Sequence, residues 1–135
     1  MNTPVVIDVV AAIIERDGKI LLARRAGDRD QAGLWEFPGG KVESGESQPA
    51  ALARELAEEL GIEATIDEFV TSHQHPISGR IIALHAWTVS QFHGIPEPRC
   101  HSEFAWCAPE QAFNYALAPA DIPLLEAFMA SRASR

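Results

Sequence analysis

The feature that most constrains the fold is a helix signal at residues 48–60, set in a chain whose other segments resemble strands. Ser47 suits a helix N-cap, Pro49 suits the first turn, and Gly61 suits the residue after the last turn. Leucines recur between these signals at spacing i, i+4, i+8: Leu52, Leu56 and Leu60. The single apolar stripe predicts an amphipathic helix that packs against a sheet.

Strand-like segments surround this helix. Residues 5–14 are a nearly continuous apolar run rich in β-branched residues, which is typical of a strand buried on both faces. Asp17 and Gly18 predict a turn into a return strand at 19–24. Further strands are expected at 64–73, 80–90 and 104–107, and further helices at 109–113 and 121–131. This order predicts an α/β fold with a mixed sheet and helices on its faces.

Length and charge limit the function. The 135 residues suit a single domain, 1–135. A net charge of -8 argues against binding to a nucleic acid polymer, which needs a basic face, but it allows a small anionic substrate screened by a metal ion. No apolar run approaches the ~18 residues of a membrane span. Two cysteines without zinc spacing predict a reducing, cytoplasmic location.

The predicted helix carries an unusual acidic face. Glu55, Glu58 and Glu59 are spaced i, i+3, i+4, where like charges cost roughly 0.2–0.5 kcal/mol per pair. Glu59 is also near the negative end of the helix dipole. A bound cation would reverse both effects, and Mg²⁺ is usually held by a few carboxylates together with substrate phosphates. The alternative is a solvated acidic face that offsets Arg54.

The surrounding residues decide between these alternatives. Residues 40–62 fit the pattern G-x5-E-x7-R-E-U-x-E-E-x-G-U, where U is a bulky apolar residue. The matching positions are Gly40, Glu46, Arg54, Glu55, Leu56, Glu58, Glu59, Gly61 and Ile62. This stretch resembles the Nudix box, and every fixed position of the box is filled.

The resemblance implies both a fold and a chemistry. Nudix proteins are α/β/α sandwiches whose box forms a loop, a helix and a loop, and they hydrolyse a nucleoside diphosphate linked to another group. The resemblance implies Mg²⁺ as cofactor, for which Mn²⁺ can substitute, at Glu55, Glu58 and Glu59. The Gly39 carbonyl is a further candidate ligand, because glycine allows close approach of the backbone to an ion. Arg54 is expected to orient a carboxylate through a bidentate bond.

Other segments resemble the MutT branch of the family. Residues 34–40 (LWEFPGG) match its approach to the box, and residues 117–130 resemble the bacterial members that act on CTP. This implies a monomeric enzyme that converts CTP, dCTP and modified forms such as 5-methyl-dCTP to the monophosphate and pyrophosphate. The alternatives are an 8-oxo-dGTP-type diphosphatase, a nucleotide-sugar or dinucleotide hydrolase, and a non-catalytic Nudix binding module. Such modules typically lose box glutamates, which this chain keeps.

Four residues are candidates for binding the nucleotide. Arg25 and Arg80 align with substrate-side arginines of MutT, although Arg25 also suits a surface ion pair and Arg80 a solvated strand edge. Asp121 stands at the base-reading position, where a carboxylate can accept a hydrogen bond from N4 of cytosine. Asp121 equally suits a helix N-cap. Glu36 either contacts the substrate or faces solvent.

One position departs from the MutT pattern. MutT has a late glutamate directly before a tryptophan that helps at the metal, whereas Ala105 precedes Trp106 here. The nearest acid is Glu103, which shares a strand face with residue 105. We therefore expect Glu103 to substitute for the missing catalytic glutamate.

Aromatic and histidine side chains allow two interpretations. Trp35 and Phe37 either stack on a base or fill the core. His73 and His75 share one strand face, as zinc ligands would, but no third ligand has suitable spacing. We interpret these histidines as a polar surface pair.

Overall fold

The computed structural model describes residues 5–28 and 30–133, and most of its strands form one mixed sheet. The strands of this sheet are β1 (Val5–Arg16), β2 (Lys19–Arg25), β3 (Trp35–Glu36), β4 (Gly39–Lys41), β6 (Phe69–Ile77), β7 (Arg80–Val89) and β9 (His101–Cys107). Their order is β3-β2-β1-β7-β6, with β4 also paired to β1 and β9 to β2. β5 (Glu63–Thr65) and β8 (Gln91–His93) form a separate two-stranded sheet.

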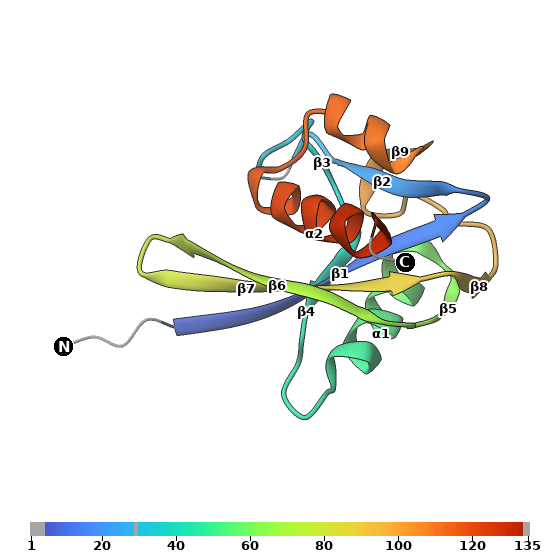
Figure 1. Ribbon diagram of the computed structural model, residues 1–135. Helices are drawn as coiled ribbons and strands as arrows, with labels where there is room; N and C mark the ends of the chain where they lie inside the picture. Colours follow the sequence, from blue (N-terminus) through green and yellow to red (C-terminus); the bar gives the residue numbers. More distant parts are fainter. Residues whose placement is uncertain (1–4, 29, 134–135) are drawn as a thin grey trace.

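Two helices cover opposite faces of the large sheet (Figure 1). These are α1 (Gln48–Leu60) and α2 (Ile122–Ala133), and 3-10 turns at Pro109–Asn114 and Pro119–Asp121 lead into α2. The predicted α/β/α sandwich is confirmed. No helix in the described part of the chain is long and apolar enough to cross a membrane.

The central strand β1 separates two hydrophobic cores. Val10, Ala12 and Ile14 pack with the leucines of α1, whereas Ala11 and Ile13 pack beneath α2. Alternate residues of a strand point to opposite faces, so residues 10–14 are buried on both sides, as predicted. The prediction is wrong for the first residues of the strand, where β1 extends with β6 and β7 away from the helices (Figure 1), and Val5 is 60% exposed.

The ends of α1 form as predicted. The Ser47 hydroxyl accepts a hydrogen bond from the Ala50 amide at 3.2 Å. Gly61 adopts a left-handed conformation with φ 71°, and its amide donates to the Ala57 carbonyl at 3.1 Å. Left-handed backbone favours glycine, so these local signals fix both boundaries of the helix.

The single strand expected at 64–73 is wrong. The chain leaves β5 at Thr65 and joins the large sheet only at Phe69. Between these strands, the Asp67 carboxylate accepts hydrogen bonds from the amide and the hydroxyl of Ser90, at 2.7 and 2.8 Å. Aspartate often replaces strand pairing with such side-chain contacts, and apolar periodicity does not reveal the change of sheet.

Candidate functional site

Arg54 is the centre of a polar network on the α1 side of the sheet. Its Nε and Nη2 donate to the two carboxylate oxygens of Glu46, at 2.7 and 2.8 Å. Nη2 also donates to the Lys41 carbonyl at 3.1 Å. Hydrogen bonds from Arg54 lower the pKa of Glu46 to about 2 and raise the pKa of Arg54 itself. The bidentate partner of Arg54 is therefore Glu46, which precedes the helix.

The same guanidinium reaches the acidic face of α1. Its Nη1 donates to Glu55 at 3.0 Å and, more weakly, to Glu58 at 3.4 Å. Burial raises the pKa of Glu55, and the hydrogen bond from Arg54 offsets this effect only in part. Glu58 is more open, with 59% of its side chain exposed. Arg54 thus connects the loop before the helix to two of the three predicted metal ligands.

Two glycines bring strand β4 close to its neighbours. A Cβ on Gly40 would lie 2.4 Å from the carboxylate carbon of Glu55. A Cβ on Gly39 would lie 1.8 Å from the Val10 carbonyl oxygen of β1. Both distances are far inside van der Waals contact. Gly40 therefore makes the space that Glu55 fills, and Gly39 permits the close approach of β4 to β1.

The carboxylates of α1 suit a cation whose remaining ligands come from the substrate. Among the described residues, no three acidic, histidine or cysteine side chains group closely enough to hold an ion by themselves. Mg²⁺ usually takes only one or two carboxylates together with substrate phosphates. Glu55 and Glu58 supply hard oxygen atoms that share the Arg54 guanidinium, and Oε1 of Glu59 is buried. Convergence of all three glutamates on one ion, with the Gly39 carbonyl, stays a prediction.

A cavity of about 640 Å³ opens on the α2 side of the sheet. Its apolar lining includes Val9, Ala11, Phe37, Ile82 and Leu84, and its polar lining includes Arg25, Asp30, Glu36, Lys41, His75 and Asp121. Gly39 also lines it. The size and the mixed lining are typical of small-molecule sites. The cavity thus unites three predicted nucleotide-binding residues with the strand that enters the box.

A partly buried ion-pair network contributes Arg25 and Glu36 to the wall of this cavity. Arg25 Nη1 donates to one oxygen of Glu36 at 2.8 Å, and His101 Nε2 lies 3.0 Å from the other. Burial alone would raise the pKa of Glu36, but the hydrogen bonds from His101 and Arg25 lower it below its usual value. An ionised Glu36 requires the proton of His101 on Nε2. Glu36 is therefore held by two protein partners, Arg25 and His101, and does not face open solvent.

Asp121 forms another part of the cavity wall. It is buried, and its Oδ1 accepts a hydrogen bond from the Phe37 amide at 3.2 Å. Burial raises its pKa to about 7, and the nearby charge of Glu36 adds to this effect, while the Phe37 amide opposes it. The bond of Asp121 leads to a residue distant in sequence and not to the first turn of α2. The N-cap interpretation of Asp121 is therefore wrong.

Comparison with known proteins identifies the family. A family model described as the NUDIX domain matches residues 4–128. The chain belongs to the NUDIX family. It is 68% identical to the CTP pyrophosphohydrolase of Escherichia coli over 96% of both chains. It is 39% identical to a putative 8-oxo-dGTP diphosphatase 2 of Mycobacterium tuberculosis, over 84% of this chain and 81% of that one.

A solved structure agrees with this assignment. The solution structure of the E. coli ORF135 protein superposes with a TM-score of 0.91 at 67% identity, covering 98% of this chain and 94% of that one. NUDIX hydrolases generally need a divalent metal ion, in line with the acidic face of α1. Residues 40–62, which fit the box pattern, lie inside the matched residues 4–128.

Two predicted site residues of this NUDIX domain lie apart from the others. Arg80 is exposed at the start of β7, opposite Ile77, and is not among the described residues that line the cavity. Glu103 lies opposite Arg24 in the pairing of β9 with β2, with 3.5 Å between the charged groups. That ion pair connects Glu103 to β2 and not to α1. The predicted roles of Arg80 and Glu103 stay predictions without a contact to support them.

The structure separates side chains that the sequence grouped together. Trp35 packs edge-on against Tyr115, with ring centroids 5.1 Å apart, whereas Phe37 lines the cavity. His75 also lines the cavity, whereas His73, with the same intermediate burial, is not among the described lining residues. His101 was not predicted at all, because no motif includes it. The pairing of β9 with β2, which sets His101 opposite Arg25, is the only signal that places it here.

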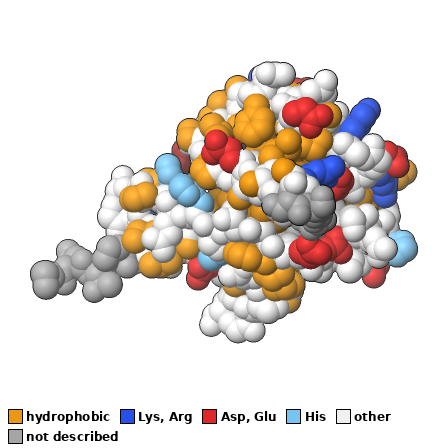
Figure 2. All heavy atoms as spheres, in the orientation of Figure 1, with side chains coloured by type: hydrophobic (Ala, Val, Ile, Leu, Met, Phe, Trp, Pro, Cys, Tyr) orange, Lys and Arg blue, Asp and Glu red, His pale blue; other side chains and the backbone are white. Residues whose placement is uncertain are grey.

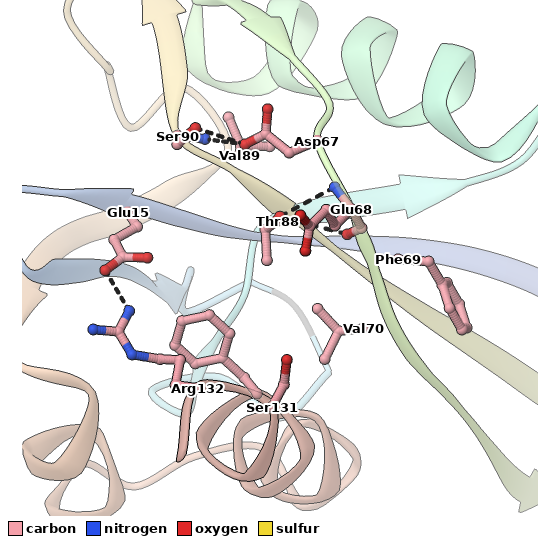
Figure 3. Close-up of a pocket in the computed structure, with 11 residues that line it drawn as sticks. Glu15, Asp67, Glu68, Phe69, Val70, Thr88, Val89, Ser90, Ser131 and Arg132 are labelled. Carbon is pink, nitrogen blue, oxygen red and sulfur yellow. Dashed lines mark hydrogen bonds and ion pairs between the residues drawn. The ribbon is translucent and has the colours of Figure 1, made fainter. Parts of the chain in front are cut away.

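A second hollow of about 340 Å³ also lies on the α2 side of the sheet, but none of the predicted site residues lines it. Figure 3 shows its polar groups already joined in pairs, Glu15 with Arg132 and Asp67 with Ser90. Figure 2 shows that apolar side chains gather over α2, while lysine and arginine side chains on this face are few. The cavity beside the box is therefore the better candidate for a nucleotide.

Proposed function

We propose that this NUDIX protein is a nucleoside triphosphate pyrophosphohydrolase that converts CTP and dCTP, including modified forms such as 5-methyl-dCTP, to the monophosphate and pyrophosphate. The observation that carries the proposal is the junction of a complete box with a nucleotide-sized cavity that contains a buried carboxylate. Strand β4 joins them, because Gly39 and Lys41 line the cavity while Gly40 contacts Glu55. The similarity to the E. coli protein named CTP pyrophosphohydrolase supports the choice of base.

Different residues of the cavity bind the two ends of the substrate. Asp121, as a carboxylate, accepts a hydrogen bond from the exocyclic amine of cytosine. Lys41 and Arg25 supply positive charge for the phosphates, which extend past β4 toward α1. The apolar floor of Val9 and Leu84 receives the flat face of the base. In this proposal the phosphate chain lies at β4, the strand that enters the box.

The box residues prepare the hydrolytic step. Glu55, Glu58 and Glu59 would hold Mg²⁺, which neutralises charge on the phosphates and lowers the pKa of bound water. Arg54 fixes Glu46 and Glu55 in place through charge-assisted hydrogen bonds. Water attacks the β-phosphorus, and pyrophosphate and the nucleoside monophosphate separate. A monomeric state and a cytoplasmic location stay predictions from the sequence.

The second candidate function is hydrolysis of oxidised purine nucleotides such as 8-oxo-dGTP. The similarity to the M. tuberculosis protein supports it, and the cavity volume suits a purine. A binding module without catalysis has less support, because the three box glutamates are retained.

A substrate panel tests the proposal. Pyrophosphate release is measured with CTP, dCTP, 5-methyl-dCTP, UTP and 8-oxo-dGTP in the presence of Mg²⁺, and again with chelator. We expect the highest kcat/KM for the cytosine nucleotides and no release with chelator. A higher kcat/KM for 8-oxo-dGTP establishes the second candidate, and no release from any triphosphate contradicts the proposed activity.

A further inference from the structure

His75 differs from its neighbour His73 in a way that the sequence does not reveal. Both belong to β6, two residues apart, so both side chains point to the same face of the sheet. His75 pairs with Ile82 and lines the cavity, whereas His73 pairs with Leu84 and is not among the described lining residues. The two histidines therefore have the same chemistry in different surroundings.

The polar groups around His75 are mostly occupied by one another. Arg25 binds Glu36 and the Asp30 carbonyl, and Asp121 accepts from Phe37. Within the described residues, the half-buried ring of His75 makes no hydrogen bond or ion pair. A partly buried imidazole that lines a cavity and has no protein partner is suited to bind a ligand.

The position of β6 indicates which part of a nucleotide would reach this ring. β4, which enters the box, pairs with β1, and β7 separates β1 from β6. Adjacent strands lie about 4.8 Å apart, so β6 is roughly 10 Å from β1 on the side away from β4. If the phosphates are held near the box, the base and the sugar extend toward β6.

We propose that His75 binds the nucleoside part of the substrate through a hydrogen bond from or to its imidazole ring. This inference rests on the proposed function and deepens it. An imidazole nitrogen donates to a base carbonyl or sugar oxygen, or accepts from a sugar hydroxyl. The contact exists in both the ground state and the transition state, so it lowers KM more than it raises kcat.

Matched alanine variants test the inference. His75→Ala is expected to raise KM for CTP and Kd for the product CMP roughly 3- to 10-fold, the range of one hydrogen bond. His73→Ala, on the same strand face, is the control and should leave both constants unchanged. His75→Gln should retain part of the affinity, whereas His75→Phe should lose as much as alanine. Equal constants for His75→Ala and His73→Ala overturn the inference, and full affinity in His75→Phe overturns the hydrogen bond.

A second measurement avoids any dependence on the folding of variants. The imidazole NMR signals of the wild-type protein are followed while CMP, UMP and dGMP are added separately. We expect the signals of His75 to shift with CMP and those of His73 to stay in place. If wild type and His73→Ala hydrolyse CTP while the His75 signals stay unmoved, only this inference fails. Absence of triphosphate hydrolysis in wild type contradicts the proposed function, and unmoved His75 signals with all three nucleotides still overturn the inference.

Discussion

The two faces of the sheet differ in how their polar groups are assembled. On the α1 face, the hydrogen-bond partners of Arg54 all lie within 13 residues of it in sequence. On the α2 face, Phe37 binds Asp121 across 84 residues, and Glu36 binds His101 across 65 residues. Spacing along one helix and its flanking loop determines the first arrangement. Strand register and the docking of α2 determine the second.

The two faces also differ in burial. The Arg54 network is partly exposed, with 59% of the Glu58 side chain open to solvent. Asp121 and His101 are buried and line or support the cavity. Substitutions in the box should therefore change turnover with little effect on the fold. Substitutions in the cavity wall should change stability together with substrate affinity.

The largest effect is expected from Glu58→Gln. The change removes the negative charge of one carboxylate from the predicted metal site. It should therefore lower kcat by raising the activation free energy by several kcal/mol. Stability should hold, because Glu58 is exposed and a crowded carboxylate is neutralised. Turnover and thermal unfolding are measured on the same preparation. Near-wild-type turnover would show that the α1 face does not carry the chemistry.

His101→Ala should lower the stability of the protein, which Glu58→Gln should not. It removes the hydrogen bond that the partly buried Glu36 carboxylate receives from His101, which costs about 1.5–3 kcal/mol of unfolding free energy for a bond to a charged group. Urea denaturation measures the loss. The control is Glu103→Ala, which breaks a half-exposed ion pair and should cost less than about 1 kcal/mol. Equal losses would show that the contact between His101 and Glu36 contributes no more to stability than a half-exposed ion pair. A large fall in kcat for Glu103→Ala would instead support its predicted catalytic role.

Asp121 makes stability depend on pH. Its pKa rises from 3.8 to about 7 on folding, so the folded protein binds the extra proton between these values. The contribution of Asp121 to stability is therefore fully present below about pH 4 and is lost as the pH rises toward 7. Asp121→Asn should flatten this fall in urea denaturation measured from about pH 5 upward. An unchanged pH slope in the variant contradicts the burial of an ionisable group at this position.

Gly40→Ala should produce the smallest of these changes. Its Cβ overlaps only the end of the Glu55 side chain, so the protein should fold with Glu55 displaced and turnover reduced roughly tenfold, or about 1.4 kcal/mol. Gly27→Ala is the matched control, because a Cβ there meets nothing within 4 Å. Equal kcat values for the two variants would show that the position of Glu55 is unimportant.

The sequence predicted the α1 face more completely than the cavity for a physical reason. The bounds of α1 follow from a cap, a glycine and a leucine stripe, all of which act within a few residues. The division of the 64–73 strand depends on the contact of Asp67 with Ser90, which periodicity does not record. The sequence named Arg25 and Asp121 by resemblance to MutT, and it left open whether Glu36 contacts the substrate or faces solvent. It missed His101 and did not distinguish His75 from His73, because strand pairing determines the surroundings of these residues.

We propose that the box residues direct water to the β-phosphorus of a nucleoside triphosphate bound in the cavity. The most direct test is the hydrolysis of CTP in ¹⁸O-water, with mass spectrometry of both products. We expect the label in pyrophosphate and no label in CMP. Label in CMP, or release of orthophosphate with accumulation of CDP, would contradict it.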